Sequence, residues 1–73
     1  MPSIDLSDLP PRLHRKGAST EIEKKTGIKI SPRTIEAWGL PATIIAGRAY
    51  HPTLAIFERV EQKIAAAERA TAA

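Results

Sequence analysis

The side chains best suited to a chemical task lie in one short segment, residues 31–38, with the sequence SPRTIEAW. A guanidinium, hydroxyls and a carboxylate at this spacing can hydrogen-bond to base edges in the major groove of DNA. At about 100° per residue on a helix, Ile35 and Trp38 share one face and should be buried, whereas Arg33 and Glu36 point outward. Trp38 is expected in the core, and stacking on a nucleic acid is the alternative. The segment therefore predicts a short helix that reads DNA.

Each outward residue of this helix has an expected role. Arg33 is placed to pair with the O6 and N7 acceptors of guanine or to grip a phosphate, and a free surface arginine is the alternative. Glu36 can accept from a cytosine amino group, and an intrahelical or cross-helix salt bridge explains it equally well. Ser31 and Thr34 can reach a phosphate or a thymine methyl, but we favour Ser31 as the helix N-cap. Ala37 lets the backbone lie close to the groove, or is simply a helix former.

A second set of candidate contacts flanks this helix in the sequence. Gly47 and Arg48 stand at the tip of a predicted hairpin, and narrow minor grooves attract arginine. The alternative for Arg48 is a hairpin charge with no partner. Arg15 and Lys16, at the start of another predicted helix, are candidate phosphate contacts. Three lysines are weaker candidates, because charges of this kind are more often solvated surface residues: Lys24, Lys25 and Lys29.

The charge distribution agrees with this placement. The chain has 73 residues, with 11 Lys and Arg against 8 Asp and Glu, for a net charge of +3. Residues 12–48 carry eight basic and three acidic side chains, a net +5, whereas residues 1–11 carry two acids and residues 49–73 three of each sign. Localised positive charge is the electrostatic footprint of a DNA-binding face, and a solvated basic surface is the alternative on charge alone.

Local patterns define the elements that must position these residues. A proline pair closes an N-terminal arm over residues 1–11, which we expect to be flexible, and residues 12–14 predict a short strand. A helix follows over 15–26, with His14 at its N-cap position and Gly27 as its left-handed C-cap.

The second half of the chain predicts a short helix, a hairpin and a long helix. After a turn over 27–30, the helix at 32–38 opens with a proline at its first position. Strands at 43–45 and 48–50 predict the hairpin, which turns around Gly47. The long helix ends near residue 69, before a frayed tail at 71–73. Four apolar residues recur along it at helical spacing and form its expected core stripe: Leu54, Phe57, Val60 and Ile64.

The order of these elements carries a family resemblance. At Ser31-Pro32-Arg33-Thr34-Ile35-Glu36-Ala37-Trp38 and at Ala46-Gly47-Arg48-Ala49-Tyr50, the chain resembles the excisionases of phages and mobile elements. These recombination directionality factors stand with the AlpA-like regulators in the MerR-like winged helix-turn-helix group. The resemblance extends over about residues 12–65.

The resemblance implies a mainly α-helical winged helix-turn-helix domain over residues 12–70, whose β-hairpin is the wing. It implies that helix 32–38 enters the major groove, while the wing reaches the adjacent minor groove or the backbone. Proteins of this kind bind repeated sites on double-stranded DNA cooperatively, associate with one another along it, bend it, and bias an integrase partner towards excision. A small transcription regulator of the same fold is the alternative.

A third interpretation, from a different class, is a protein-interaction module whose C-terminal helix docks a partner. It requires an apolar stripe larger than the core needs. Ile56 is the residue that decides this, because it falls off the main stripe.

Other classes of protein are not expected. Without cysteine there is no disulfide or thiolate metal site, and His14 and His51 stand apart from other ligands, as capping or surface residues. We therefore expect no metal and no cofactor. A chain of this layout offers no deep pocket for a catalytic triad, so we expect no enzyme. The apolar stretches are too short to span a membrane, and the N-terminus lacks the regions of a secretory signal. These features predict a cytoplasmic protein, and the resemblance to the excisionases implies association with the bacterial nucleoid.

Overall fold

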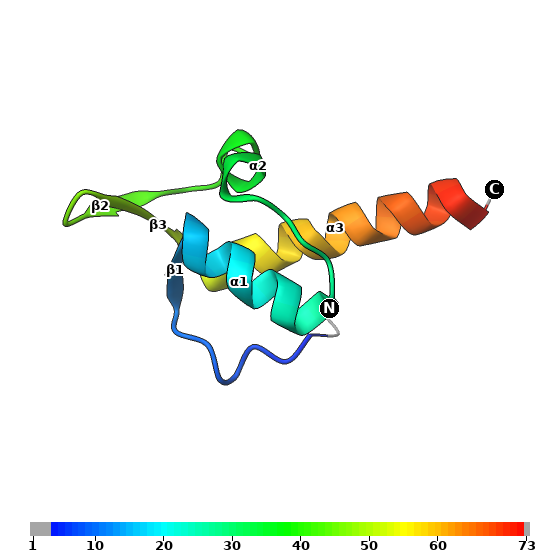
Figure 1. Ribbon diagram of the computed structural model, residues 1–73, viewed down its shortest axis with the longest axis horizontal. Coiled ribbons are helices and arrows are strands. Elements are labelled where there is room, and N and C mark those ends of the chain that lie inside the picture. Colours follow the sequence, from blue (N-terminus) through cyan, green and yellow to red (C-terminus); the bar gives the residue numbers. More distant parts are fainter. Residues whose placement is uncertain (1–3, 73) are drawn as a thin grey trace.

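The computed structural model describes residues 4–72, which form three helices and a three-stranded antiparallel sheet (Figure 1). In chain order the elements are β1 (Arg12–His14), α1 (Arg15–Thr26), α2 (Pro32–Ala37), β2 (Thr43–Ile45), β3 (Arg48–Pro52) and α3 (Thr53–Ala72). The expected class, a mainly helical chain with a small β-hairpin, is confirmed at this level.

α1 begins and ends where the sequence predicts. The Nδ1 atom of His14 accepts a hydrogen bond from the Gly17 amide at 3.1 Å, so His14 is the N-cap. Gly27, with φ of 75°, donates its amide to the Glu23 carbonyl at 2.8 Å. A Cβ on residue 17 would lie 2.6 Å from the His14 ring. Glycine at this position is therefore what allows the imidazole to reach the helix backbone.

The β2–β3 hairpin projects from the helices at one end of the molecule (Figure 1). Ala46 and Gly47 form its two-residue turn with φ of 52° and 78°, the left-handed conformation that such hairpin turns require. β3 runs two residues further than expected, to Pro52, because β1 pairs with its second half. The sheet order is β1-β3-β2, so β3 is the central strand.

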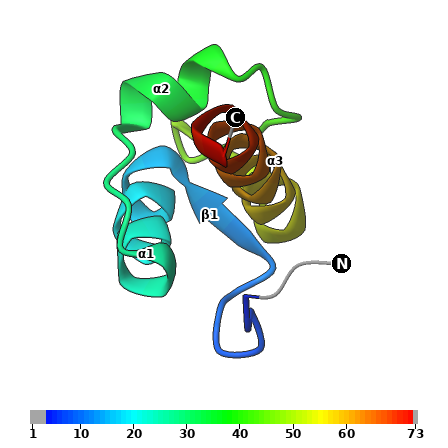
Figure 2. The ribbon, with the colours of Figure 1, turned by 90° about the vertical axis from the view of Figure 1, so that its right-hand side faces the viewer.

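The core lies between the helices and the sheet. In the view along the long axis, α1 and α3 lie side by side and α2 crosses above them (Figure 2). One cluster of buried apolar side chains joins all three helices to β1: Leu13, Ala18, Ile22, Ile35, Ile56, Phe57 and Val60.

The predicted core stripe of α3 is wrong in one residue. Leu54 is 59% exposed, whereas Ile56 is fully buried. The buried face follows Thr53, Ile56, Phe57 and Val60 at spacings of three and four, which turns Leu54 towards the solvent. Because the core accounts for Ile56, this residue gives no support to a partner-docking helix.

Residues 4–11 lie against the folded body, although a flexible arm was expected. Three apolar side chains of this segment pack against the core: Ile4, Leu6 and Leu9. Thr53 donates its amide to the Pro11 carbonyl at 2.9 Å and its hydroxyl to the Pro10 carbonyl. The expectation for residues 1–3 falls outside the described residues.

An ion pair also holds this segment to α1. The Lys25 ammonium lies 2.6 Å from the Asp8 carboxylate. Their hydrogen bond lowers the pKa of Asp8 and raises the pKa of Lys25. At the other terminus, residues 71 and 72 of the expected frayed tail belong to α3, and residue 73 lies outside the described part.

Candidate nucleic-acid interface

The start of α2 is built as the sequence predicts. The Ser31 hydroxyl accepts from the Thr34 amide at 3.2 Å and lies 3.0 Å from the Thr34 hydroxyl. Ser31 is therefore the N-cap, with Pro32 at the first helical position, where its missing N–H costs nothing. The helix ends at Ala37, one residue earlier than expected, and Trp38 is its C-cap.

α2 has one buried and one exposed face. Ile35 is fully buried, and the half-buried Trp38 packs against the core, so the core assignment of this tryptophan is confirmed. The four candidate DNA contacts within α2 are all exposed: Arg33, Thr34, Glu36 and Ala37. Their contact with DNA stays a prediction.

Glu36 has a partner within the protein. Its carboxylate lies 3.2 Å from Nη1 of Arg15, the first residue of α1. The cross-helix salt bridge, one of the two expectations for Glu36, is therefore present. Their side chains are 61% and 32% exposed, and such a pair contributes about 0–1 kcal/mol. Its importance is geometric, because it joins α1 to α2.

The prediction that His51 is a capping or surface residue is wrong, since its side chain is buried and only 1% exposed. It lies opposite Leu13 on the central strand, so its ring is turned to the buried face of the sheet. Its Nδ1 lies 2.8 Å from the Pro41 carbonyl, which can only accept, so Nδ1 carries the proton. The bare Nε2 then accepts from Nε of Arg15 at 3.3 Å.

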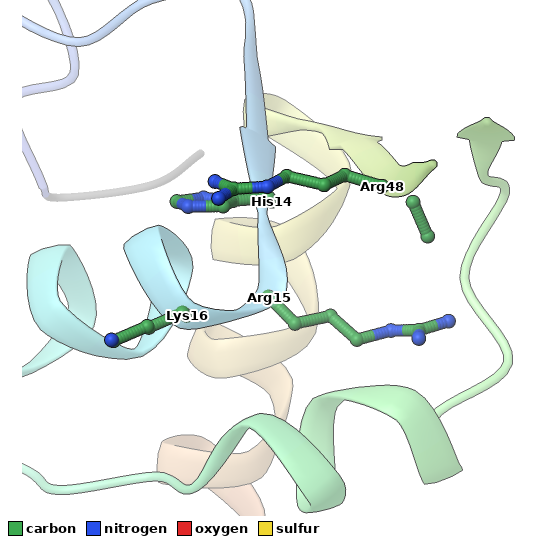
Figure 3. A pocket seen from close by; sticks show the side chains of 5 residues that line it. His14, Arg15, Lys16 and Arg48 are labelled. Atoms are coloured by element: carbon green, nitrogen blue, oxygen red, sulfur yellow. The ribbon is translucent and has the colours of Figure 1, made fainter. Parts of the chain in front are cut away.

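A concavity of about 310 Å³ opens between the start of α1 and the hairpin (Figure 3). Five residues line it: His14, Arg15, Lys16, Arg48 and Ala49. Arg15 and Lys16 extend in opposite directions from the first turn of α1 (Figure 3). Lys16 and Arg48 are exposed, and within residues 4–72 neither side chain makes an ion pair or hydrogen bond. The fold thus brings together three predicted cationic contacts from two distant parts of the chain.

The other predicted contacts lie apart from this concavity. Gly47 is exposed at the hairpin tip, next to Arg48 in sequence. Lys24 lies 3.9 Å from Glu21, and Lys25 is bound to Asp8, so these two weaker candidates are paired within the protein. Lys29 is exposed in the turn that precedes α2.

Neither a metal site nor a transmembrane segment emerges from the described residues. Across residues 4–72, no three His, Cys, Asp or Glu side chains are grouped so as to hold a metal ion. None of the helices in that range has the length and apolar character needed to cross a bilayer.

Comparison with known proteins identifies no relative. No protein-family model, no curated protein and no solved structure matches this chain.

Proposed function

We propose that the protein is a sequence-specific DNA-binding protein of the winged helix-turn-helix type. In this proposal α2 is the recognition helix and the β2–β3 hairpin is the wing. The observation that carries the proposal is the concavity between the start of α1 and the hairpin, which the exposed cations Lys16 and Arg48 both line. The exposed face of α2 adjoins it, because Glu36 on that face bonds Arg15.

The electrostatics of this surface support a polyanionic partner. The side chains of Lys16 and Arg48 are exposed and carry no counter-charge among the described residues, so they are available to phosphates. Arg33 adds a third such cation on α2. Cations on α1, α2 and the hairpin would let one DNA duplex contact all three elements.

The finer proposal is an excisionase-type recombination directionality factor that bends DNA and acts with an integrase. It rests on the residues of the α2 segment and of the hairpin turn, and a transcription regulator of the same architecture is the second candidate. The molecule measures 45 × 26 × 19 Å, and α2 has six residues. One copy would therefore cover few base pairs, and useful specificity calls for several copies side by side on repeated sites.

Fluorescence anisotropy with labelled duplexes, followed by footprinting on DNA flanking the gene, tests this proposal. We expect binding that weakens steeply as salt rises, and steeper titrations on fragments with several sites than on single-site fragments. Failure to bind any duplex at low salt would contradict the DNA-binding proposal. Equal affinity for single and multiple sites, with a Hill coefficient near one, would contradict self-association only.

Arg48→Gln should weaken binding to most sequences and reduce the slope of log affinity against log salt by about one unit. The reason is that a hairpin arginine touches backbone or minor groove, where little sequence information is available. Arg69→Gln is the matched control, since it removes the same charge in the last turn of α3. That end of α3 lies away from the hairpin (Figure 1). If the slope of log affinity against log salt is the same for Arg48→Gln as for Arg69→Gln, the hairpin does not contact DNA.

A further inference from the structure

The orientation of α2 relative to the hairpin depends on α1. α2 packs chiefly against α1, and residues 38–42 connect it to β2 without helix or strand. α1 in turn contacts both β1 and β3. The angle between α2 and the hairpin, the two proposed DNA-contacting elements, is therefore set by their contacts with α1.

Arg15, at the first position of α1, bonds to both elements. Its Nη1 donates to Glu36 in α2 at 3.2 Å, and its Nε donates to His51 in β3 at 3.3 Å. A guanidinium is planar, with donors in a rigid fork, so two bonds from it fix the direction between their acceptors.

The β3 end of this bridge is itself fixed. The His51 ring is buried and held by its hydrogen bond to the Pro41 carbonyl, in the segment that leaves α2. A chain of three hydrogen bonds thus runs from this segment through His51 and Arg15 to Glu36. Rotating α2 against the hairpin would break at least one of them.

We propose that Arg15 is a positioning residue that sets the angle between α2 and the hairpin, and not a phosphate contact. Its effect on DNA rests on the proposed function, whereas its effect on the free protein does not. A preset angle lets both elements meet their grooves without a separate ordering cost on binding. A specific site must be contacted by both elements at once. A change in the angle should therefore lower the affinity for a specific site more than the affinity for random DNA.

Arg15→Lys is the decisive variant, because it keeps the charge but places a single ammonium where two bonds are needed. We expect the ratio of specific to random affinity to fall by about fivefold. The salt slope should be unchanged, since no phosphate contact is lost. In the free protein, residual dipolar couplings should report a changed orientation of α2 relative to β3. Wild-type affinities and couplings in Arg15→Lys would overturn the proposal.

Lys16→Gln is the matched control in the same concavity. It should lower the salt slope by about one unit and leave the couplings unchanged. If Arg15→Gln lowers the slope in the same way as Lys16→Gln does, Arg15 is a phosphate contact and the proposal fails.

A second variant protects the test against misfolding of the Arg15 variants. His51→Asn keeps a donor for the Pro41 carbonyl and removes the acceptor for Arg15, so it should shift α2 as Arg15→Lys does. Unchanged couplings in His51→Asn would also overturn the proposal. If wild-type protein binds no DNA, the proposed function fails, and the couplings still decide the positioning role.

Discussion

Phe57→Ala is expected to lower the free energy of unfolding by about 3–5 kcal/mol, through lost burial and the cavity left behind. Phe57 is the largest fully buried side chain of the described residues, and it packs in the cluster that joins the three helices to β1. A domain of this size has roughly 4–11 kcal/mol of stability. The substitution should therefore remove a large part of the free energy of unfolding. A urea titration monitored by circular dichroism would measure this loss.

Leu54→Ala is the control for this prediction, one helical turn earlier on α3. Leu54 is 59% exposed, so the change should cost less than about 1 kcal/mol. Hydrophobic spacing alone put both residues on one stripe and predicts similar costs. If the two substitutions lower the free energy of unfolding by similar amounts, α3 does not turn Phe57 towards the core and Leu54 towards the solvent.

The elements that local chemistry determines were predictable from the sequence. His14, Gly27 and Ser31 stand at the predicted helix caps, where their bonds involve residues three or four positions away. The hairpin turn follows from Gly47 in the same way. The length of β3 was not predictable, since its last residues pair with β1, far away in the sequence.

The errors in the candidate site have the same origin. With β3 ending at residue 50, His51 falls outside the sheet, and its buried position cannot be anticipated. The choice between Leu54 and Ile56 depends on how α3 is rotated against α1, which helical spacing does not specify. For Glu36 the sequence allowed a base contact or a salt bridge, and only the approach of Arg15 decides that the bridge forms.

The distribution of bonds on α2 makes Arg33 the strongest candidate for reading a base. Ser31 and Thr34 bond each other in the cap, and Glu36 is paired with Arg15. Within residues 4–72, Arg33 is the charged residue of α2 that has no ion pair. Its guanidinium can therefore pair with the two guanine acceptors without first breaking an internal bond.

Arg33→Ala should accordingly cost about 1–3 kcal/mol of affinity on the specific site, a loss of roughly 5- to 150-fold, and relax the preference at one base position. Affinity for random DNA should fall far less. Arg33→Lys separates base reading from charge, because a lysine keeps the attraction to phosphate and lacks the planar pair of donors. We expect it to lose specific affinity nearly as far as Arg33→Ala, with the salt slope of the wild type. If Arg33→Ala instead weakens specific and random DNA equally, and Arg33→Lys restores both, then Arg33 grips a phosphate and sequence is read elsewhere on the protein.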